Sequence, residues 1–139
     1  MALKEASILE WVEHYVRHRD MIFGRIENIV KQQDSLIVKY KDGSSENFLY
    51  FLDLDLVDIA GVKTLTTIVT LNAKHNLDVL IKKWKPFSEI KDLKIIFINP
   101  DSELEKKWII KPYVHNRICD EKSLKQGLQA MFETVESIV

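Results

Sequence analysis

An acidic segment is the first feature of the chain that could do chemistry. Asp53, Asp55 and Asp58 alternate with apolar residues directly after a run that is typical of a β-strand. Carboxylates at a strand end can hold Mg²⁺, which binds one or two carboxylates and completes its shell with water. A polar strand end at the edge of a sheet is the competing interpretation. The segment therefore predicts a candidate metal site on Asp53 and Asp55.

Two short basic segments each carry a tryptophan. Residues 82–85 read Lys-Lys-Trp-Lys, and residues 106–108 read Lys-Lys-Trp. Lysines contact phosphates and a tryptophan can stack on an unpaired base, so both segments are typical of nucleic-acid binding. The alternative is an exposed helix face, in which the tryptophan anchors in the core and the lysine stems cover apolar surface. The sequence leaves both interpretations open.

Histidine and cysteine offer two further candidates. His14 and His18 are four residues apart, which on a helix could bring two imidazoles to one metal ion, although a solvated polar face is the simpler explanation. Cys119 follows His115 and Arg117, which could lower the pKa of its thiol, whereas a free cysteine is commonly just a small buried residue. Neither pattern supplies a complete site.

Length and composition bound these interpretations. The chain has 139 residues, which predicts a single domain spanning 1–139, and its 20 basic residues nearly balance 21 acidic ones. Net charge therefore gives no argument for an anionic partner. One cysteine excludes an intramolecular disulfide, and the start of the chain has no signal-peptide pattern, so we expect a cytoplasmic protein without a membrane partner. No GxGxxG, P-loop, CxxC or GxSxG motif occurs.

The elements that must position these residues begin with a helix and a meander. Apolar side chains at helical spacing predict a helix over about residues 3–18. Strands are then expected over residues 22–30, 36–40 and 47–52. Asp42-Gly43, between the last two, is a strong hairpin signal because glycine adopts a positive φ without cost. Three consecutive strands with short connections suggest an antiparallel meander.

A strand–helix–strand unit follows the meander. Residues 64–71 are β-branched and uncharged, whereas residues 73–85 change to helical period and are expected to end at Pro86. Residues 93–98 are nearly all apolar, so this strand should be buried and parallel to the first. A strand over 108–114, placed at an edge by Pro112, and a C-terminal helix complete an α/β fold with a mixed (α+β) sheet. The helix carries an apolar stripe: Leu124, Leu128, Met131, Phe132, Val135 and Ile138.

This order of elements resembles the restriction-endonuclease-like, or PD-(D/E)xK, nuclease fold, over roughly residues 3–100. Members of that family present an aspartate at the end of one core strand and a Glu-x-Lys on the next, which together hold a divalent metal and position the attacking water. Asp53 or Asp55 matches the aspartate, whereas the Glu-x-Lys position reads Thr70-Leu71-Asn72, with Lys74 just beyond it. The resemblance therefore implies a degenerate active-site motif.

The leading hypothesis is a non-catalytic nuclease-like domain that binds DNA or RNA, or that serves as a subunit of a nucleic-acid-processing complex. No cofactor is expected. One alternative is an active nuclease that uses Mg²⁺ at a rearranged site built on Asp53, Asp55 and Lys74. Another is a protein-interaction module, such as a homodimer, with no nucleic-acid role. The residues expected to contact nucleic acid are Arg17, Asn72, Lys74, Lys82, Lys83 and Trp84.

Overall fold

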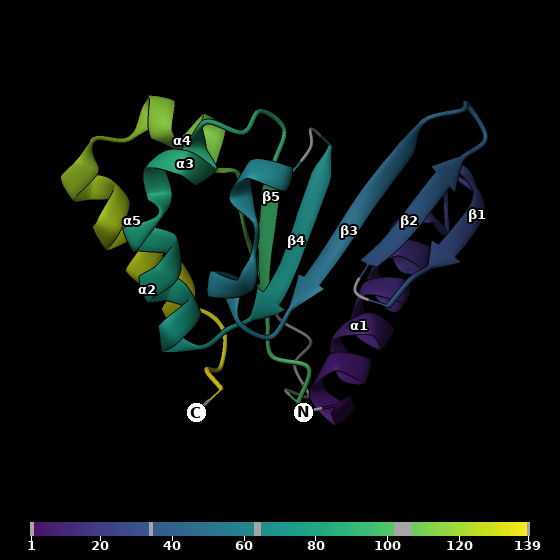
Figure 1. The fold of residues 1–139 in the computed structure, drawn as a ribbon, viewed down its shortest axis with the longest axis horizontal. Coiled ribbons are helices and arrows are strands. Elements are labelled where there is room, and N and C mark those ends of the chain that lie inside the picture. Colours follow the sequence, from purple (N-terminus) through teal and green to yellow (C-terminus); the bar gives the residue numbers. More distant parts are fainter. Residues whose placement is uncertain (1, 34, 63–64, 102–106, 139) are drawn as a thin grey trace.

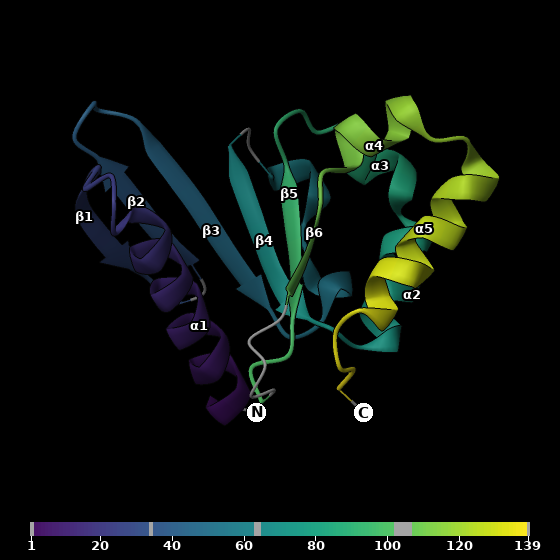
Figure 2. The ribbon, with the colours of Figure 1, turned by 180° about the vertical axis from the view of Figure 1, so that it is seen from behind.

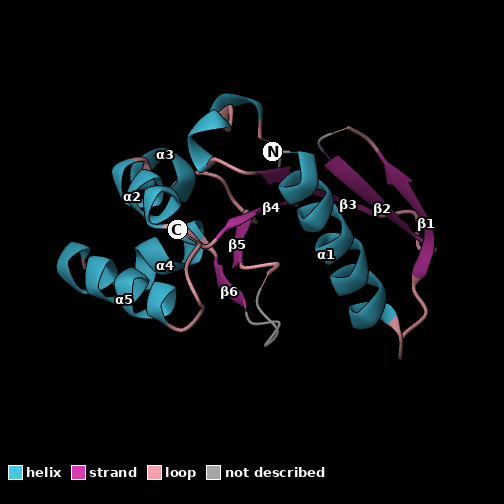
Figure 3. Ribbon diagram, turned by 90° about the horizontal axis from the view of Figure 1, so that it is seen from below, coloured by secondary structure: helices cyan, strands magenta, loops and turns pink. Residues whose placement is uncertain are grey.

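A mixed β-sheet separates one long helix from a layer of shorter helices (Figures 1 and 3). The computed structural model describes residues 2–33, 35–62, 65–101 and 107–138. Within these residues the sheet has six strands in the order β1-β2-β3-β4-β5-β6. The strands are β1 (Ile26–Lys31), β2 (Ser35–Tyr40), β3 (Ser45–Phe51), β4 (Thr66–Leu71), β5 (Lys94–Ile98) and β6 (Lys107–Ile110). The helices are α1 (Ala2–Asp20), α2 (Lys74–Lys82), α3 (Trp84–Ser88), α4 (Pro112–Ile118) and α5 (Glu121–Glu133), with 3₁₀ turns η1 (Leu54–Leu56) and η2 (Ile59–Gly61).

The strand directions confirm the predicted meander and the predicted parallel unit. Strands β1, β2 and β3 pair antiparallel, β3, β4 and β5 run parallel, and β6 is antiparallel to β5. Gly43 has a φ of 90° in the β2–β3 hairpin, as the Asp-Gly signal requires. Helices α2 and α3 connect β4 to β5. The first residue of the expected central strand, Thr64, lies outside the described residues.

Two apolar cores form because β4 and β5 are buried on both faces. Every residue of β4 is buried, as its uncharged sequence predicts. Ile68 faces a core shared with α2, α3 and α5, whereas Val69 and Leu71 face a core built with α1. Helix α1 therefore covers one face of the sheet, and α2, α3 and α5 cover the other (Figure 2). None of the helices within the described ranges is both long and apolar enough to cross a membrane.

The first strand begins later than its sequence suggests. Asp20 ends α1 and accepts hydrogen bonds from the backbone N–H groups of Arg25 and Ile26, at 2.8 and 3.0 Å. The chain between them turns at Gly24, whose φ is 58°. The prediction of a strand from Ile22 is therefore wrong, because the carboxylate of Asp20 holds residues 21–24 in a turn. Ile22 is 89% exposed there.

Two prolines start helical turns where the sequence predicts other roles. Pro86 is expected to end a helix, but α2 ends at Lys82 and Pro86 lies in the first turn of α3. Pro112 is expected in an edge strand, but β6 ends at Ile110 and Pro112 is the first residue of α4. A first helical turn has no internal partner for the N–H that proline lacks, so both positions tolerate it. Strand β6 itself does lie at a sheet edge, as predicted.

The last helix is shorter than its apolar stripe. Helix α5 ends at Glu133, and the chain then leaves helical geometry. Val135 is buried in the core beneath α5, whereas Ile138 packs against the α1 core on the other face of the sheet. The prediction that both belong to one helical stripe is wrong, because the segment after α5 turns back to the sheet.

Asn72, the residue after β4, fixes that returning segment. It is fully buried, and its Nδ2 donates to the carbonyls of Phe132, Val135 and Glu136 at 3.2, 3.0 and 3.4 Å. Its Oδ1 accepts from Trp108 Nε1 at 2.7 Å. Its backbone N–H donates to the Ile98 carbonyl, and its own carbonyl accepts from Ile138. One residue therefore joins β4, β5, β6 and the C-terminal segment.

Replacing Asn72→Ala should lower the free energy of unfolding by about 3 kcal/mol, because the buried Trp108 Nε1 and the C-terminal carbonyls lose their partners. Urea unfolding followed by tryptophan fluorescence measures this. Asn28→Ala, at an exposed position of β1, is the matched control and should cost less than about 0.5 kcal/mol. Equal stability of the two variants would contradict the role of Asn72.

Candidate functional site

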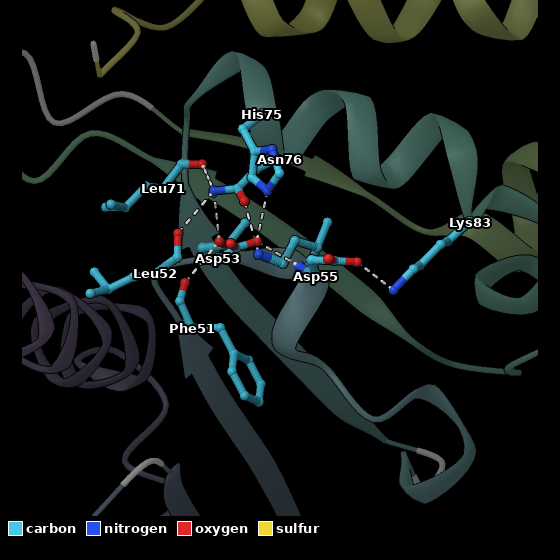
Figure 4. Close-up of polar contacts among 10 residues, drawn as sticks. Phe51, Leu52, Asp53, Asp55, Leu71, His75, Asn76 and Lys83 are labelled. Atoms are coloured by element: carbon cyan, nitrogen blue, oxygen red, sulfur yellow. Dashed lines mark hydrogen bonds and ion pairs between the residues drawn. The ribbon is translucent and has the colours of Figure 1, made fainter.

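The acidic segment lies where β3 ends, beside the first turn of α2 (Figure 4). Asp53 precedes η1, and its Oδ1 accepts from the Asp55 backbone N–H at 2.9 Å. The same oxygen lies 3.0 Å from His75 Nε2. The carboxyl ends of parallel strands are where ligands bind in open α/β sheets, so the segment occupies a favourable place for a site.

Asn76 holds this corner in place. It is buried, and its Oδ1 accepts from the Leu54 N–H at 2.8 Å. Its Nδ2 lies 2.9 Å from the Leu71 carbonyl, and 3.1 Å from both the Leu52 carbonyl and the Thr70 hydroxyl. The amide therefore ties the acidic segment to the end of β4 (Figure 4). Sequence reasoning does not single out Asn76, since an asparagine in the first turn of an expected helix indicates a surface position.

The second aspartate is paired with a predicted nucleic-acid contact. Lys83 Nζ lies 2.6 Å from Asp55 Oδ1. The hydrogen bond from Lys83, and next the charge of Lys83, hold the pKa of Asp55 below its usual value. Asp53 and Asp55 thus lie in one turn, but one faces a histidine and the other a lysine. Within the described residues, no group of three or more His, Cys, Asp or Glu gathers as a metal site.

The residues at the Glu-x-Lys position have structural partners. Thr70 Oγ1 donates to the Phe51 carbonyl at 2.8 Å, and it accepts from Asn76. Asn72 is fully buried, so its side chain offers nothing to a nucleic acid. Neither side chain supplies the carboxylate or the amine that the nuclease pattern requires. The predicted contact of Asn72 with a nucleic acid conflicts with its burial, because both the nitrogen and the oxygen of its side-chain amide form hydrogen bonds inside the protein.

The structure brings Lys74 and Lys82 together with residues that sequence reasoning does not find. Both line a groove between α2 and α5, with a volume of about 610 Å³. Lys74 Nζ lies 3.3 Å from Asp78 Oδ1 and 3.4 Å from Gln129 Oε1. We call this the α2–α5 groove; its lining residues are Lys74, Asp78, Ile81, Lys82, Lys125, Gln126, Gln129, Ala130 and Glu133. The spacing of four residues between Lys125 and Gln129 indicates that they share one face of a helix, but it does not indicate that this face lies against α2.

The remaining predicted contacts lie elsewhere. Arg17 is on α1, across the sheet from the groove, and lies 4.0 Å from Glu13. Trp84 begins α3, is partly buried, and its Nε1 donates to Asn116 Oδ1 at 2.9 Å. Trp108 is buried, while Lys106 lies outside the described residues. The two Lys-Lys-Trp segments therefore use their tryptophans as anchors in the protein, which agrees with the alternative interpretation.

The histidine and cysteine candidates stay isolated. The rings of His14 and His18 stack at 6.1 Å on the exposed face of α1. Cys119 is free and partly exposed at the end of α4. The Nδ1 atom of His115, four residues before Cys119, lies 3.0 Å from the carbonyl oxygen of Lys111. Neither candidate gains a further ligand or catalytic partner among the residues described.

Comparisons with known proteins give no family for this chain. No protein-family model matches the sequence, and it matches neither a curated protein nor a solved structure at a significant level.

Replacing Lys83→Gln should raise the pKa of Asp55, because the hydrogen bond and the charge that stabilise the carboxylate are both removed. The pKa of Asp55 is depressed in the folded state, so its contribution to stability is present above the unfolded pKa of about 3.9 and disappears as the pH falls through the folded pKa. Carboxyl ¹³C NMR titration measures the shift. Lys85→Gln is the control, and an unchanged Asp55 pKa in Lys83→Gln would refute the pairing.

Proposed function

We propose that the protein is a nuclease-like domain that binds the phosphate backbone of DNA or RNA along the α2–α5 groove without cutting it. The observation that carries the proposal is the convergence of Lys74 and Lys82 from α2 with Lys125 from α5. Lysines from segments far apart in the chain thus line one groove. Phosphate contacts supply most of the affinity of sequence-independent nucleic-acid binding.

The charges in the groove favour an anion. Lys82 and Lys125 are exposed, and no ion pair holds either of them within the described residues. Lys74 is paired with Asp78, but both side chains are about 60% exposed, at 61% and 59%. An exposed pair of this kind contributes little to stability, so a phosphate can replace the carboxylate at small cost. The acids Asp78 and Glu133 limit the affinity, which should be weak.

The position of Trp84 indicates that the protein contacts phosphates rather than bases. Trp84 is partly buried and hydrogen-bonded to Asn116, so it is not free to stack on a base. Binding should therefore rest on phosphates and be independent of base sequence, because phosphate contacts position a nucleic acid without reading it. Single and double strands should both bind.

The absence of cleavage is the second part of the proposal. Thr70 and Asn72 support it, because both side chains are occupied by hydrogen bonds that hold the sheet and the C-terminal segment together. A degenerate relative of the restriction-endonuclease-like fold would keep the sheet and lose the metal site in this way. The expected setting is a reducing cytoplasm, since Cys119 is a single free thiol.

The triple variant Lys74→Gln, Lys82→Gln, Lys125→Gln should weaken binding of a short DNA or RNA oligonucleotide by about tenfold or more at low salt. The slope of log affinity against log salt should also fall, by about 0.7–0.9 for each phosphate that the variant no longer binds. Fluorescence anisotropy with labelled single- and double-stranded oligonucleotides measures both quantities.

The matched control for that experiment replaces three lysines outside the groove: Lys39→Gln, Lys85→Gln and Lys91→Gln. It removes the same charge and should leave affinity close to that of the wild type. Equal weakening in the two triple variants would show that only net charge matters, and would overturn the groove as the binding site. No measurable binding at low salt would overturn the proposal and favour the protein-interaction hypothesis.

Cleavage assays separate the proposal from the active-nuclease alternative. With Mg²⁺ or Mn²⁺, the wild-type protein should leave supercoiled plasmid and labelled oligonucleotides intact. Metal-dependent cleavage that Asp55→Ala abolishes, and that Asp58→Ala retains, would contradict the non-catalytic proposal. Asp58 is the suitable control because it is an exposed aspartate of the same acidic segment.

A further inference from the structure

A second hollow lies at the other ends of the parallel strands. The end of α1, the β2–β3 hairpin and the first residues of β4 and β5 surround a pocket of about 850 Å³. We call it the α1–hairpin pocket. Pockets of about 300–1,000 Å³ are the usual size for small organic ligands. Thr67 and Lys94, which line it, are the second residue of β4 and the first of β5, whereas the acidic segment lies where β3 ends.

A hydrogen-bonded cluster forms a rigid wall of this pocket. Glu46 Oε1 accepts from Arg19 at 2.7 Å and from the Tyr40 hydroxyl at 2.9 Å. Arg19 also donates to the Tyr40 hydroxyl at 3.0 Å, and Thr67 Oγ1 donates to Glu46 Oε2 at 3.3 Å. Burial, and next the bond to Glu46, raise the pKa of Tyr40 to about 12, so its hydroxyl stays neutral at physiological pH. The charge of Glu46 is thus satisfied within the protein.

Two of the other acids of the pocket hold backbone turns, whereas Asp92 also lines the pocket and has no hydrogen bond or ion pair among the described residues. Asp20 accepts from the N–H groups of Arg25 and Ile26. Asp42 accepts from both the backbone N–H and the hydroxyl of Ser44. These carboxylates are therefore committed to the local fold rather than to the pocket lysines.

Lys94 is a partly buried cation of the pocket that lacks such a partner among the described residues. It is partly buried at the start of β5, and no hydrogen bond or ion pair of its side chain occurs within the described ranges. Burial lowers the pKa of Lys94, and the charge of Glu46 opposes that effect only in part. A partly desolvated cation without a partner gains free energy from an anion placed beside it.

An exposed aromatic side chain, Phe23, also lines the pocket. Phe23 is 64% exposed, although it is a large aromatic residue, and it lies in the turn that Asp20 holds. The guanidinium of Arg25 lies 4.7 Å from the centre of its ring. An exposed aromatic ring with a stacked guanidinium is a suitable surface for a flat organic group, and Arg25 adds a second positive charge.

We propose that the α1–hairpin pocket binds a small organic anion, with a phosphate or carboxylate group beside Lys94 and a flat ring against Phe23 and Arg25. This site is independent of the α2–α5 groove, because no residue lines both. Loss of binding at one site therefore says nothing about the other. The ligand class is defined by one negative group and one aromatic or similarly flat group, at about the size of a mononucleotide.

The test is an NMR titration of the ¹⁵N-labelled protein with four probes: 1-naphthyl phosphate, 1-naphthoate, 1-naphthalenemethanol and inorganic phosphate. The two aromatic anions should shift the amide signals of Tyr40, Glu46, Thr67 and Lys94. The neutral alcohol and inorganic phosphate should bind at least about tenfold more weakly, since each lacks one of the two groups. Comparing the phosphate with the carboxylate identifies which anion the pocket prefers.

Two variants assign the contacts. Lys94→Met keeps the length of the side chain and removes its charge, and should weaken binding of the preferred anion about tenfold. Phe23→Ser, at an exposed position, should weaken it without affecting the fold. Lys39→Met, on the opposite face of the sheet, is the matched control and should bind as the wild type does. Absence of shifts at the pocket residues with every probe would overturn the proposal, as would equal binding of the neutral alcohol or full binding by Lys94→Met.

Discussion

The hydrogen bonds of Asn72 are the interaction on which the arrangement of the C-terminal half depends. A buried amide must find partners, and Asn72 finds them on Trp108 and on the carbonyls that follow α5. The segment after α5 is not helical, so its carbonyls need donors that a helix would otherwise supply. Asn72 provides such a donor at the carboxyl end of β4. That connection, together with the packing of Leu128 and Phe132 in the core shared with α2, holds α5 beside α2 and so forms the α2–α5 groove.

Periodicity predicts most of the sheet but not the use of its polar residues. The alternation in β2 and β3, the uncharged sequence of β4 and the apolar run of β5 each correspond to one kind of burial, so the meander and the parallel unit could be derived. Pro86 and Pro112 could not be placed, because proline fits both the end of one element and the first turn of the next. From the sequence alone, Asn72 and Asn76 resemble polar residues of a surface site. Only their tertiary contacts show that both are buried.

The candidate sites, too, could be predicted from the sequence only in part. Lys74 and Lys82 share one helical face, so their proximity could be predicted from spacing, but Lys125 reaches the groove only because α5 packs beside α2. Arg17 resembles them in chemistry alone, and the sheet separates it from the groove. The pocket beside Lys94 left no local signal, because its wall joins α1, the β2–β3 hairpin and β4. Convergence of distant segments is a property of topology, which residue types do not encode.

A nearly neutral chain can still present unpaired cations, because its acids are used differently from its bases. Asp20, Asp42, Asp53 and Asp120 each accept hydrogen bonds from backbone N–H groups at turns and helix starts. The bonds to Ser44 and Ser123 hold the pKa values of Asp42 and Asp120 below the usual range, which is the mark of a carboxylate needed in its charged form. A lysine cannot accept a hydrogen bond and has no comparable role in a turn. The carboxylates are therefore drawn into the fold, while Lys82, Lys94 and Lys125 have no ion pair among the described residues. The overall balance of 20 bases against 21 acids thus conceals an excess of positive charge in the α2–α5 groove, which is lined by three lysines and two acids.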